Sequence, residues 1–366
     1  MNANDEHVLP ARPRKGRGAV SNPDGRFESR THRSIDDGWR SAQDDALDPP
    51  KVRTTLTPDN ARSILSSNDS PDVGFSLSIN PYRGCEHGCV YCFARPSHAY
   101  LGLSPGLDFE TRLFYKPQAA ALLEEELRRP NHRCSPIALG INTDAYQPVE
   151  RELKISRGIL RVLDAFQHPV TIVTKSALVE RDLDILAAMA QRNLAQVLFS
   201  ITTLNSDLSR RLEPRTTAPR RRLEAMRRLS AAGVPVGVMT APVIPVLTDP
   251  ELETILEASR EAGAESAGYV MLRLPHEVKD LFREWLTHHE PLKADHVMSV
   301  IRNLRGGKDY DSAFGTRMRG TGPFAELVAQ RFALTCKRLG FDRHRRALDA
   351  TRFTVPPRAG DQISLF

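Results

Sequence analysis

Cysteine and long apolar runs are scarce in this chain of 366 residues. Its five cysteines are clustered and odd in number, which argues against the disulfide framework of a secreted domain. No run approaches the ~18 consecutive apolar residues of a membrane-spanning helix. The N-terminus also lacks the apolar segment of a signal peptide. We therefore expect a protein of the reducing cytoplasm.

Charge is unevenly distributed along the chain. The first 200 residues carry 25 basic and 25 acidic side chains, so the whole net charge of +6 lies in residues 201–366. A basic excess of this kind favours a polyanionic partner. Hydrophobic residues make up 40% of the chain, an ordinary proportion for a globular protein with a sizeable core.

Three of the five cysteines lie close together with the spacing C-x3-C-x2-C, and they are Cys85, Cys89 and Cys92. They follow an alternating segment, residues 75–79, that predicts a strand. Gly84 and Gly88 allow the tight turns that bring three sulfurs together. Thiolates favour iron–sulfur clusters or zinc. A cubane [4Fe–4S] cluster normally takes four thiolates, so three leave one iron free. Structural zinc would instead need a fourth ligand, such as His87, His98 or Cys134.

From residue 75 onward the sequence alternates between strand and helix patterns. The predicted strands are 75–79, 136–141, 170–174, 196–202, 234–240 and 267–272, and the helices between them are 116–129, 151–166, 180–192, 219–232 and 249–262. Six such alternations with short connections require parallel pairing and right-handed crossovers. The sequence therefore predicts an α/β fold, a partial (β/α)6 barrel of the TIM type.

The chain divides into four predicted regions. Residues 1–50 are polar and rich in Arg, Asp, Pro and Gly, which predicts a largely disordered arm. Residues 51–275 form the barrel, with one short lead-in strand near residues 53–56. Residues 276–350 form a helical extension, with helices at 277–289, 293–304 and 324–339, that we expect to cover the open side of the barrel. Residues 351–366 form a tail.

The cysteine motif after the first strand, with an aromatic residue before its last cysteine, resembles the hallmark of the radical S-adenosylmethionine (SAM) superfamily. The resemblance covers residues 75–275. It implies that Cys85, Cys89 and Cys92 ligate a [4Fe–4S] cluster and that Tyr91 lies beside the adenine of SAM. It also implies reductive cleavage of SAM to a 5′-deoxyadenosyl radical, and a reducing electron donor of the flavodoxin or ferredoxin type.

Polar residues stand at the carboxyl ends of the predicted strands, where parallel barrels carry out their chemistry. They are Asn142, Thr143 and Asp144 after the second strand, Lys175 after the third, and Ser200, Thr202 and Asn205 at the fourth. The ammonium group of SAM needs acceptors, its carboxylate a cation and its ribose hydrogen-bonding side chains. The alternative for any one of these residues is a strand-end cap or an exposed polar side chain.

The motifs after strands two to four resemble the spore photoproduct lyase-like branch of that superfamily. They are Thr143-Asp144-Ala145-Tyr146, Thr174-Lys175-Ser176 and Ser200-Ile201-Thr202-Thr203. The resemblance implies repair of a DNA lesion or related lyase chemistry. The lyase has a hydrogen-donating cysteine just before its Thr-Ser-Asp, but here that place holds Ile141 or Asn142. Candidate hydrogen-atom donors are instead Tyr82, Tyr146 and Tyr269, for which a structural role is the alternative.

Arginines are concentrated in two parts of the chain where they are candidates for phosphate contacts. They are Arg210, Arg211, Arg215, Arg220, Arg221 and Arg222 after the fourth strand, and Arg317, Arg319, Arg343, Arg345 and Arg346 near the end. A smaller basic patch in the arm comprises Arg12, Arg14, Lys15 and Arg17. The alternative in each case is a solvated charged surface.

The last five residues, Gln362–Phe366, resemble the pentapeptide that binds the bacterial sliding clamp. A terminal segment with aliphatic and aromatic anchors can dock in an apolar pocket. The sequence as a whole thus predicts a radical SAM enzyme that acts on nucleic acid. The alternative is a non-enzymatic nucleic-acid-binding protein in which the three cysteines hold structural zinc or an iron–sulfur site.

Overall fold

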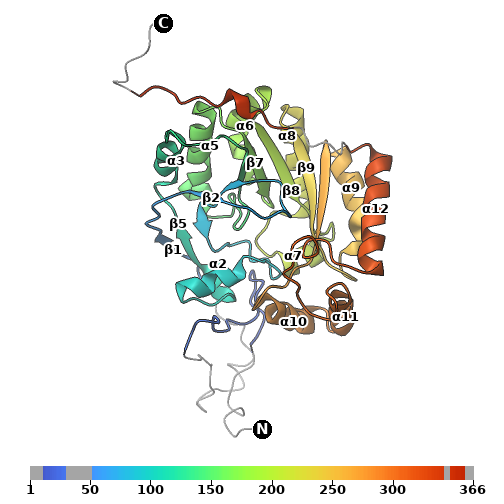
Figure 1. The fold of residues 1–366 in the computed structure, drawn as a ribbon. Coiled ribbons are helices and arrows are strands. Elements are labelled where there is room, and N and C mark those ends of the chain that lie inside the picture. The colour runs from blue at the N-terminus through green and yellow to red at the C-terminus, as the bar shows by residue number, and fades with distance from the viewer. Residues whose placement is uncertain (1–10, 30–51, 342–346, 359–366) are drawn as a thin grey trace.

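The structure is a computed structural model that describes residues 11–29, 52–341 and 347–358 (Figure 1). Its main sheet has seven strands in the order β10-β9-β8-β7-β6-β3-β2. They are β2 (Leu65–Ser67), β3 (Leu77–Ile79), β6 (Ile137–Leu139), β7 (Val170–Thr174), β8 (Ala195–Ser200), β9 (Val236–Val243) and β10 (Ser266–Met271). All six strands from β3 to β10 are parallel and neighbour one another in chain order, and only β2 runs antiparallel, beside β3. The predicted partial (β/α)6 barrel is confirmed.

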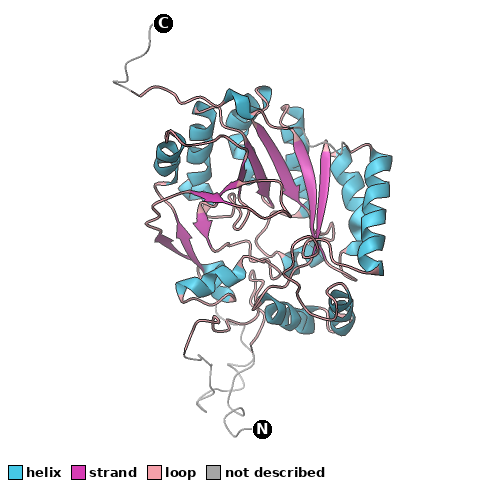
Figure 2. Cartoon of the chain, in the orientation of Figure 1, coloured by secondary structure: helices cyan, strands magenta, loops and turns pink. Residues whose placement is uncertain are grey.

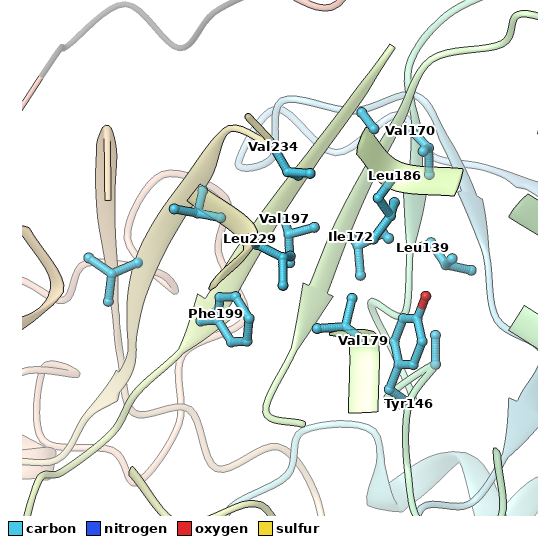
Figure 3. Packing of buried hydrophobic residues seen from close by; sticks show 14 of the residues in the cluster. Leu139, Tyr146, Val170, Ile172, Val179, Leu186, Val197, Phe199, Leu229 and Val234 are labelled. Carbon is cyan, nitrogen blue, oxygen red and sulfur yellow. The ribbon is translucent and has the colours of Figure 1, made fainter. Parts of the chain in front are cut away.

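Helices cover the outer face of this curved sheet (Figure 2). They are α3 (Ala119–Leu127), α4 (Glu150–Leu153), α5 (Ile155–Ala165), η2 (Ala177–Asp182), α6 (Leu183–Gln191), α8 (Pro219–Ala231), η3 (Asp249–Glu251) and α9 (Leu252–Glu261). The residues of β7 alternate between fully buried and half-buried, because one face packs on helices while the other lines the barrel. Figure 3 shows the packed side, where Ile172 and Val197 of the sheet lie near Leu186 and Leu229 of the helices.

The predicted helix over residues 151–166 is divided in two. Lys154 has a left-handed φ of 52° between α4 and α5. The carboxylate of Glu150 then accepts hydrogen bonds from the backbone N–H groups of Ile155 (3.1 Å) and Ser156 (3.1 Å), which begins a new helix. The hydrophobic period continues through this break, so the sequence pattern did not indicate it.

A second, three-stranded sheet and two short helices before α3 were not predicted beyond one lead-in strand. They are β1 (Thr55–Pro58), β4 (Tyr82–Arg83), β5 (Arg112–Tyr115), η1 (Arg95–Leu101) and α2 (Leu107–Thr111). The sheet order is β1-β5-β4, so residues 82–83 join the cysteine segment to this layer. Strands of two to four residues show too little alternation to be recognised in the sequence.

The disordered-arm prediction is wrong for residues 11–29. Arg17, Gly18, Ala19 and Val20 are buried, and the Arg17 guanidinium donates to the carbonyls of Glu110 (3.0 Å) and Val52 (2.7 Å). Arg17 is therefore part of the fold and not of a free basic patch. The segment is held by long-range polar contacts, which leave no periodic pattern in the sequence. The rest of the predicted arm, residues 1–10 and 30–50, lies outside the described residues.

The expectation that residues 276–350 cover the open side of the barrel is wrong for the helices of this region. These helices are α10 (Val278–His289), α11 (Ala294–Asn303) and α12 (Pro323–Leu339). α10 and α11 belong to the same hydrophobic cluster as Val90 and Tyr91 at the mouth of the barrel. α12 lies on α9, with Arg331 paired to Glu253 (2.7 Å), and continues the outer layer (Figure 1).

Residues 305–322, which we call the strap, connect the two edges of the sheet instead. Met271 of β10 donates its backbone N–H to the Met318 carbonyl (2.9 Å). At the other edge, Asp72 in the turn between β2 and β3 accepts from the N–H of Gly315 (2.7 Å) and from Arg317. The open side of the barrel is therefore crossed by irregular chain.

The last described segment, which contains η4 (Ala350–Arg352), lies at the opposite end of the barrel from the cysteines. Phe353 packs there on Phe166.

No helix in the described ranges is both long enough and apolar enough to cross a bilayer.

Candidate functional site

The three motif cysteines lie in a loop at the carboxyl end of β3, directly after β4. The Cys85 N–H donates to the Phe109 carbonyl (2.9 Å) and the Val90 N–H to that of Leu212 (3.1 Å), so both sides of the loop are fixed. Gly84 and Gly88 have φ values of +78° and +66°. A Cβ on Gly84 would come within 2.6 Å of Leu113 Cδ2, which explains why this turn needs glycine.

A buried ion pair between Arg95 and Glu110 holds the backbone of the cysteine loop in place. Arg95 donates to the carbonyls of Cys89 (2.9 Å) and Gly88 (3.1 Å) and to the carboxylate of Glu110 (2.5 Å). Glu110 also accepts from the N–H groups of Gly18 (3.0 Å) and Ala19 (2.8 Å). The N-terminal segment and the cysteine loop therefore share one carboxylate.

The donor set fits an iron–sulfur cluster. All three thiols are free, and burial raises the pKa of Cys85, Cys89 and Cys92 above the ordinary thiol value. Thiolates in such an environment need a cationic partner, which cluster irons supply. A cubane distributes its ligands over different irons, so the three sulfurs need not meet at one ion.

The fourth ligand that structural zinc requires is not supplied here. No three Cys, His, Asp or Glu side chains are gathered around a single-ion position in residues 11–29, 52–341 and 347–358. Cys134 precedes β6 and so lies at the opposite end of the strands. His98 Nε2 bonds the Arg112 carbonyl (3.0 Å), and His87 Nδ1 faces Asp144 Oδ2 (3.4 Å).

A polar cluster lies beside the loop at the carboxyl ends of β7 and β8. Lys175 Nζ donates to Ser200 Oγ (2.5 Å) and to the Ala241 carbonyl (3.1 Å). The same Nζ lies 3.4 Å from Glu213 Oε1 and 5.8 Å from the centre of the Tyr91 ring. The structure thus brings together three predicted cofactor contacts, Tyr91, Lys175 and Ser200.

Glu213, which the sequence did not indicate, is the centre of this cluster. Its carboxylate is buried and accepts from Arg222 Nη2 (2.5 Å), Thr202 Oγ1 (2.8 Å) and the Tyr91 hydroxyl. Burial by itself would raise the pKa of Glu213, but Arg222 and Lys175 outweigh it and hold the pKa well below the ordinary range. Glu213 follows α7 (Ser206–Leu212), in a stretch with no recognisable motif.

The remaining predicted contacts lie at the same end of the barrel but are largely engaged in the fold. Asp144 accepts from Thr174 Oγ1 (2.8 Å) and the Lys175 N–H (2.7 Å). Burial opposes its ionisation, yet His87 and the backbone N–H groups of Lys175 and Tyr146 lower the pKa of Asp144. Thr143 donates to the Tyr82 carbonyl (2.9 Å), whereas the Asn142 side chain is exposed. Asn205 caps α7.

The three candidate tyrosines have structural partners. The hydroxyls of Tyr82 and Tyr146 donate to the buried carboxylates of Glu150 and Asp182. The Tyr146 ring lies beside Leu139 and Val179 in the hydrophobic core (Figure 3). Tyr269 packs its ring against Phe332 of α12, with centroids 4.7 Å apart. These contacts agree with the structural alternative for all three.

Most of the predicted phosphate-contacting arginines in the described regions are paired with carboxylates. Arg222 is fully buried on Glu213, and Arg211, Arg215, Arg221 and Arg317 bind Glu290, Glu86, Glu180 and Asp72. Arg210 and Arg220 form exposed pairs within their own helices. Arg319 lies over the Tyr269 ring. Arg343, Arg345, Arg346 and the terminal pentapeptide lie outside the described residues.

Residues 79–258 match the family model of the radical SAM superfamily. Uncharacterized proteins of Mycobacterium tuberculosis and Mycobacterium bovis are 40% identical to the chain over 219 residues, which is 59% of this chain and 64% of theirs. An uncharacterized protein of Methanocaldococcus jannaschii is 28% identical over 184 residues, 50% of this chain and 66% of its own length. The mycobacterial matches thus span less than two thirds of those relatives.

The fold is similar to that of spore photoproduct lyase. Its complex with dinucleoside spore photoproduct gives a TM-score of 0.56 at 14% identity, covering 78% of both chains. A double mutant of that lyase with bound AdoMet and the same dinucleoside gives a TM-score of 0.55 at 14% identity, covering 78% of this chain and 79% of the other. At this level of identity the likeness concerns the fold.

Proposed function

We propose that residues 79–258, which match the radical SAM family model, form a radical SAM domain, and that the protein cleaves SAM reductively at a [4Fe–4S] cluster and acts on nucleic acid by lyase-type or modification chemistry. Cys85, Cys89 and Cys92 would each hold one iron and leave the fourth for SAM. When bound, the cluster supplies the electron that splits SAM into methionine and a 5′-deoxyadenosyl radical, which abstracts hydrogen from the substrate.

The observation that carries this proposal is the position of Tyr91. It lies between two of the cysteines, and its hydroxyl donates to Glu213, the carboxylate that faces Lys175. One side chain therefore connects the cysteine loop to the polar cluster. Lys175 is held by Ser200 and the Ala241 carbonyl, in a position to meet the carboxylate of SAM.

The other proposed contacts with SAM lie at the same end of the barrel as Tyr91 and Lys175. Asn142 offers an exposed amide, and Thr143 and Asp144 lie next to it at the end of β6. Tyr91 would lie by the adenine and Ser200 near the ribose. The buried walls of this cluster exclude water from the reacting groups, which is the main task of such a protein.

A nucleic-acid substrate is supported by the basic excess after residue 200 and by the likeness in fold to a lyase crystallised with a dinucleoside lesion. Ile141 or Asn142 would stand in the place of the lyase's hydrogen-donating cysteine, so the proposed reaction differs from that of the lyase in its hydrogen donor. A low-potential flavodoxin or ferredoxin in a reducing cytoplasm, and a sliding clamp bound through Gln362–Phe366, complete the proposal.

Anaerobic reconstitution tests the central claim. We expect Mössbauer spectra of a [4Fe–4S] cluster and formation of 5′-deoxyadenosine from SAM under dithionite. Both should be lost in the triple variant Cys85→Ala/Cys89→Ala/Cys92→Ala and kept in Cys134→Ala, a matched control at the other end of the barrel. A colourless protein that retains zinc and does not turn over SAM would support the non-enzymatic alternative.

A further inference from the structure

A small polar hollow lies on the outer side of the cysteine loop. Its volume is about 220 Å³, and it is bounded by segments that follow four different strands, β4, β6, β7 and β8. Its polar lining residues are His87, Arg151, Ser176, Arg215, Thr216 and Thr217. Pockets for whole drug-sized ligands measure ~300–1,000 Å³, so this hollow suits a single small group.

The charge of the hollow is positive. No aspartate or glutamate lines it. Arg151 is exposed, and among the described residues its guanidinium has neither an ion pair nor a hydrogen-bond partner. Arg215 pairs with Glu86 (3.2 Å) through one nitrogen, while its side chain remains 37% exposed. Two guanidinium groups therefore face a space that no carboxylate of the described residues lines.

Two hydroxyl groups in the lining of the hollow also favour an anionic ligand. Thr217 Oγ1 accepts from the Ala177 N–H (3.0 Å), and Ser176 Oγ accepts from the Leu178 N–H (3.2 Å). Neither hydroxyl has an acceptor for its own hydrogen within the parts of the chain that the structure describes. Both hydroxyls can therefore donate into the hollow.

The N-terminus of the neighbouring helix α8 adds to the positive electrostatic potential of the hollow. α8 begins two residues after Thr217, its N-cap Ala218 makes no side-chain cap, and its first turn contains no acidic residue. The partial positive charge of a helix N-terminus favours anions within about one turn. Here this partial charge adds to the effect of the two arginines and two hydroxyls that line the hollow.

We infer that this hollow binds one phosphodiester group of a nucleic-acid strand, an inference that rests on the proposed function. A phosphodiester carries one negative charge and only acceptor oxygens, which matches a lining of guanidinium groups and free hydroxyls. A larger hollow of about 610 Å³ between α5 and η2 is less suitable. Its Arg157 is neutralised by Asp182 (2.8 Å) and Asp184 (2.6 Å).

The position of the hollow relates it to the polar cluster. Asp144 contacts His87, which lines the hollow, and also binds the backbone of Lys175, whose side chain enters the cluster. The hollow therefore lies at the carboxyl ends of the strands, at the same end of the barrel as the polar cluster. The strand is thereby held at the rim of the barrel, from which a base can enter.

Fluorescence anisotropy of a labelled single-stranded oligodeoxynucleotide tests the inference. It should use the anaerobically reconstituted full chain with SAM, across a range of KCl concentrations. We expect Arg151→Ala to weaken binding about three- to tenfold and to reduce the slope of log K against log[KCl] by about one. Arg151→Lys keeps the charge and should retain the slope. Arg227→Ala is the matched control, because Arg227 is exposed and without a partner in the described structure, but lies farther along α8.

Two outcomes would overturn the inference. One is unchanged affinity and slope in Arg151→Ala, or an equal loss in Arg227→Ala. The other is an oligonucleotide that does not bind the wild-type protein at all. SAM cleavage without nucleic acid, measured on the same preparations, should be equal in all of these proteins. Its absence from the wild type would contradict the proposed SAM cleavage. Its presence with no binding by the wild type would contradict the nucleic-acid substrate as well as the phosphate site, whereas its presence with unchanged binding in Arg151→Ala would contradict only the phosphate site.

Discussion

Arg95 and Glu110 are both fully buried and lie 2.5 Å apart beneath the cysteine loop. The pair joins the carbonyls of Gly88 and Cys89 to the backbone of the N-terminal segment. Removing one member of a buried pair leaves an uncompensated charge, whereas an exposed pair contributes little.

We therefore expect Glu110→Ala to lower the free energy of unfolding by about 3–5 kcal/mol, measured by urea denaturation. It should also reduce the iron bound per chain after reconstitution, because the cysteine loop loses its support. The control is Glu224→Ala, which breaks the exposed Arg220–Glu224 pair and should change stability by less than about 1 kcal/mol. Equal effects of the two substitutions would contradict a special role for Glu110.

Glu213 should make stability depend on pH in the acid range. Its pKa is lowered in the folded protein, so its contribution is complete above the unfolded pKa of about 4.3 and is lost as pH falls below that value. In Glu213→Gln this contribution is absent at every pH. The difference in unfolding free energy between the wild type and Glu213→Gln should therefore shrink as pH falls from 6 to 3. A constant difference would show that Glu213 acts through packing alone.

The His132–His168 pair should give a second pH dependence at the opposite end of the barrel. Burial lowers the pKa of His168 to about 4, and its Nε2 lies 3.3 Å from that of His132. The pKa of an unfolded histidine is about 6.5. The contribution of His168 to the free energy of unfolding is therefore fully present above pH 6.5. It falls by about 1.4 kcal/mol per pH unit as the pH decreases from 6.5 toward 4. His168→Asn should flatten this slope in thermal unfolding measured between pH 5 and 7. His296→Asn, at an exposed position, should leave it unchanged.

Asp72 should control the mobility of the strap, residues 305–322. It is the acceptor for both Gly315 and Arg317, and it lies at the far edge of the sheet from β10. Asp72→Asn keeps the shape but removes the charge that binds Arg317. We expect faster hydrogen exchange and faster tryptic cleavage at Arg317 and Arg319, with little change in the midpoint of global unfolding. Asp69→Asn, in the same turn but exposed, should behave as the wild type.

The sequence determined much of the fold and indicated the proposed cluster ligands, because both depend on local pattern. The β-branched run Val170–Thr174 predicted β7 to the residue, and the repeated strand–helix pattern predicted the parallel sheet. The spacing of Cys85, Cys89 and Cys92 and the polar residues at strand ends placed the candidate site at one end of the barrel. In a parallel sheet every carboxyl strand end lies at the same edge, so order along the chain suffices to bring Lys175 and Ser200 together.

Only the tertiary structure decided which polar groups meet across long separations in sequence. Glu110 joins Gly18, Ala19 and Arg95, and Glu213 joins Tyr91, although neither acid belongs to a periodic pattern. The strap and the N-terminal segment are likewise held by hydrogen bonds between residues as many as 263 positions apart. Such contacts depend on the distances that the folded backbone sets, whereas periodicity reports only which face of an element is apolar.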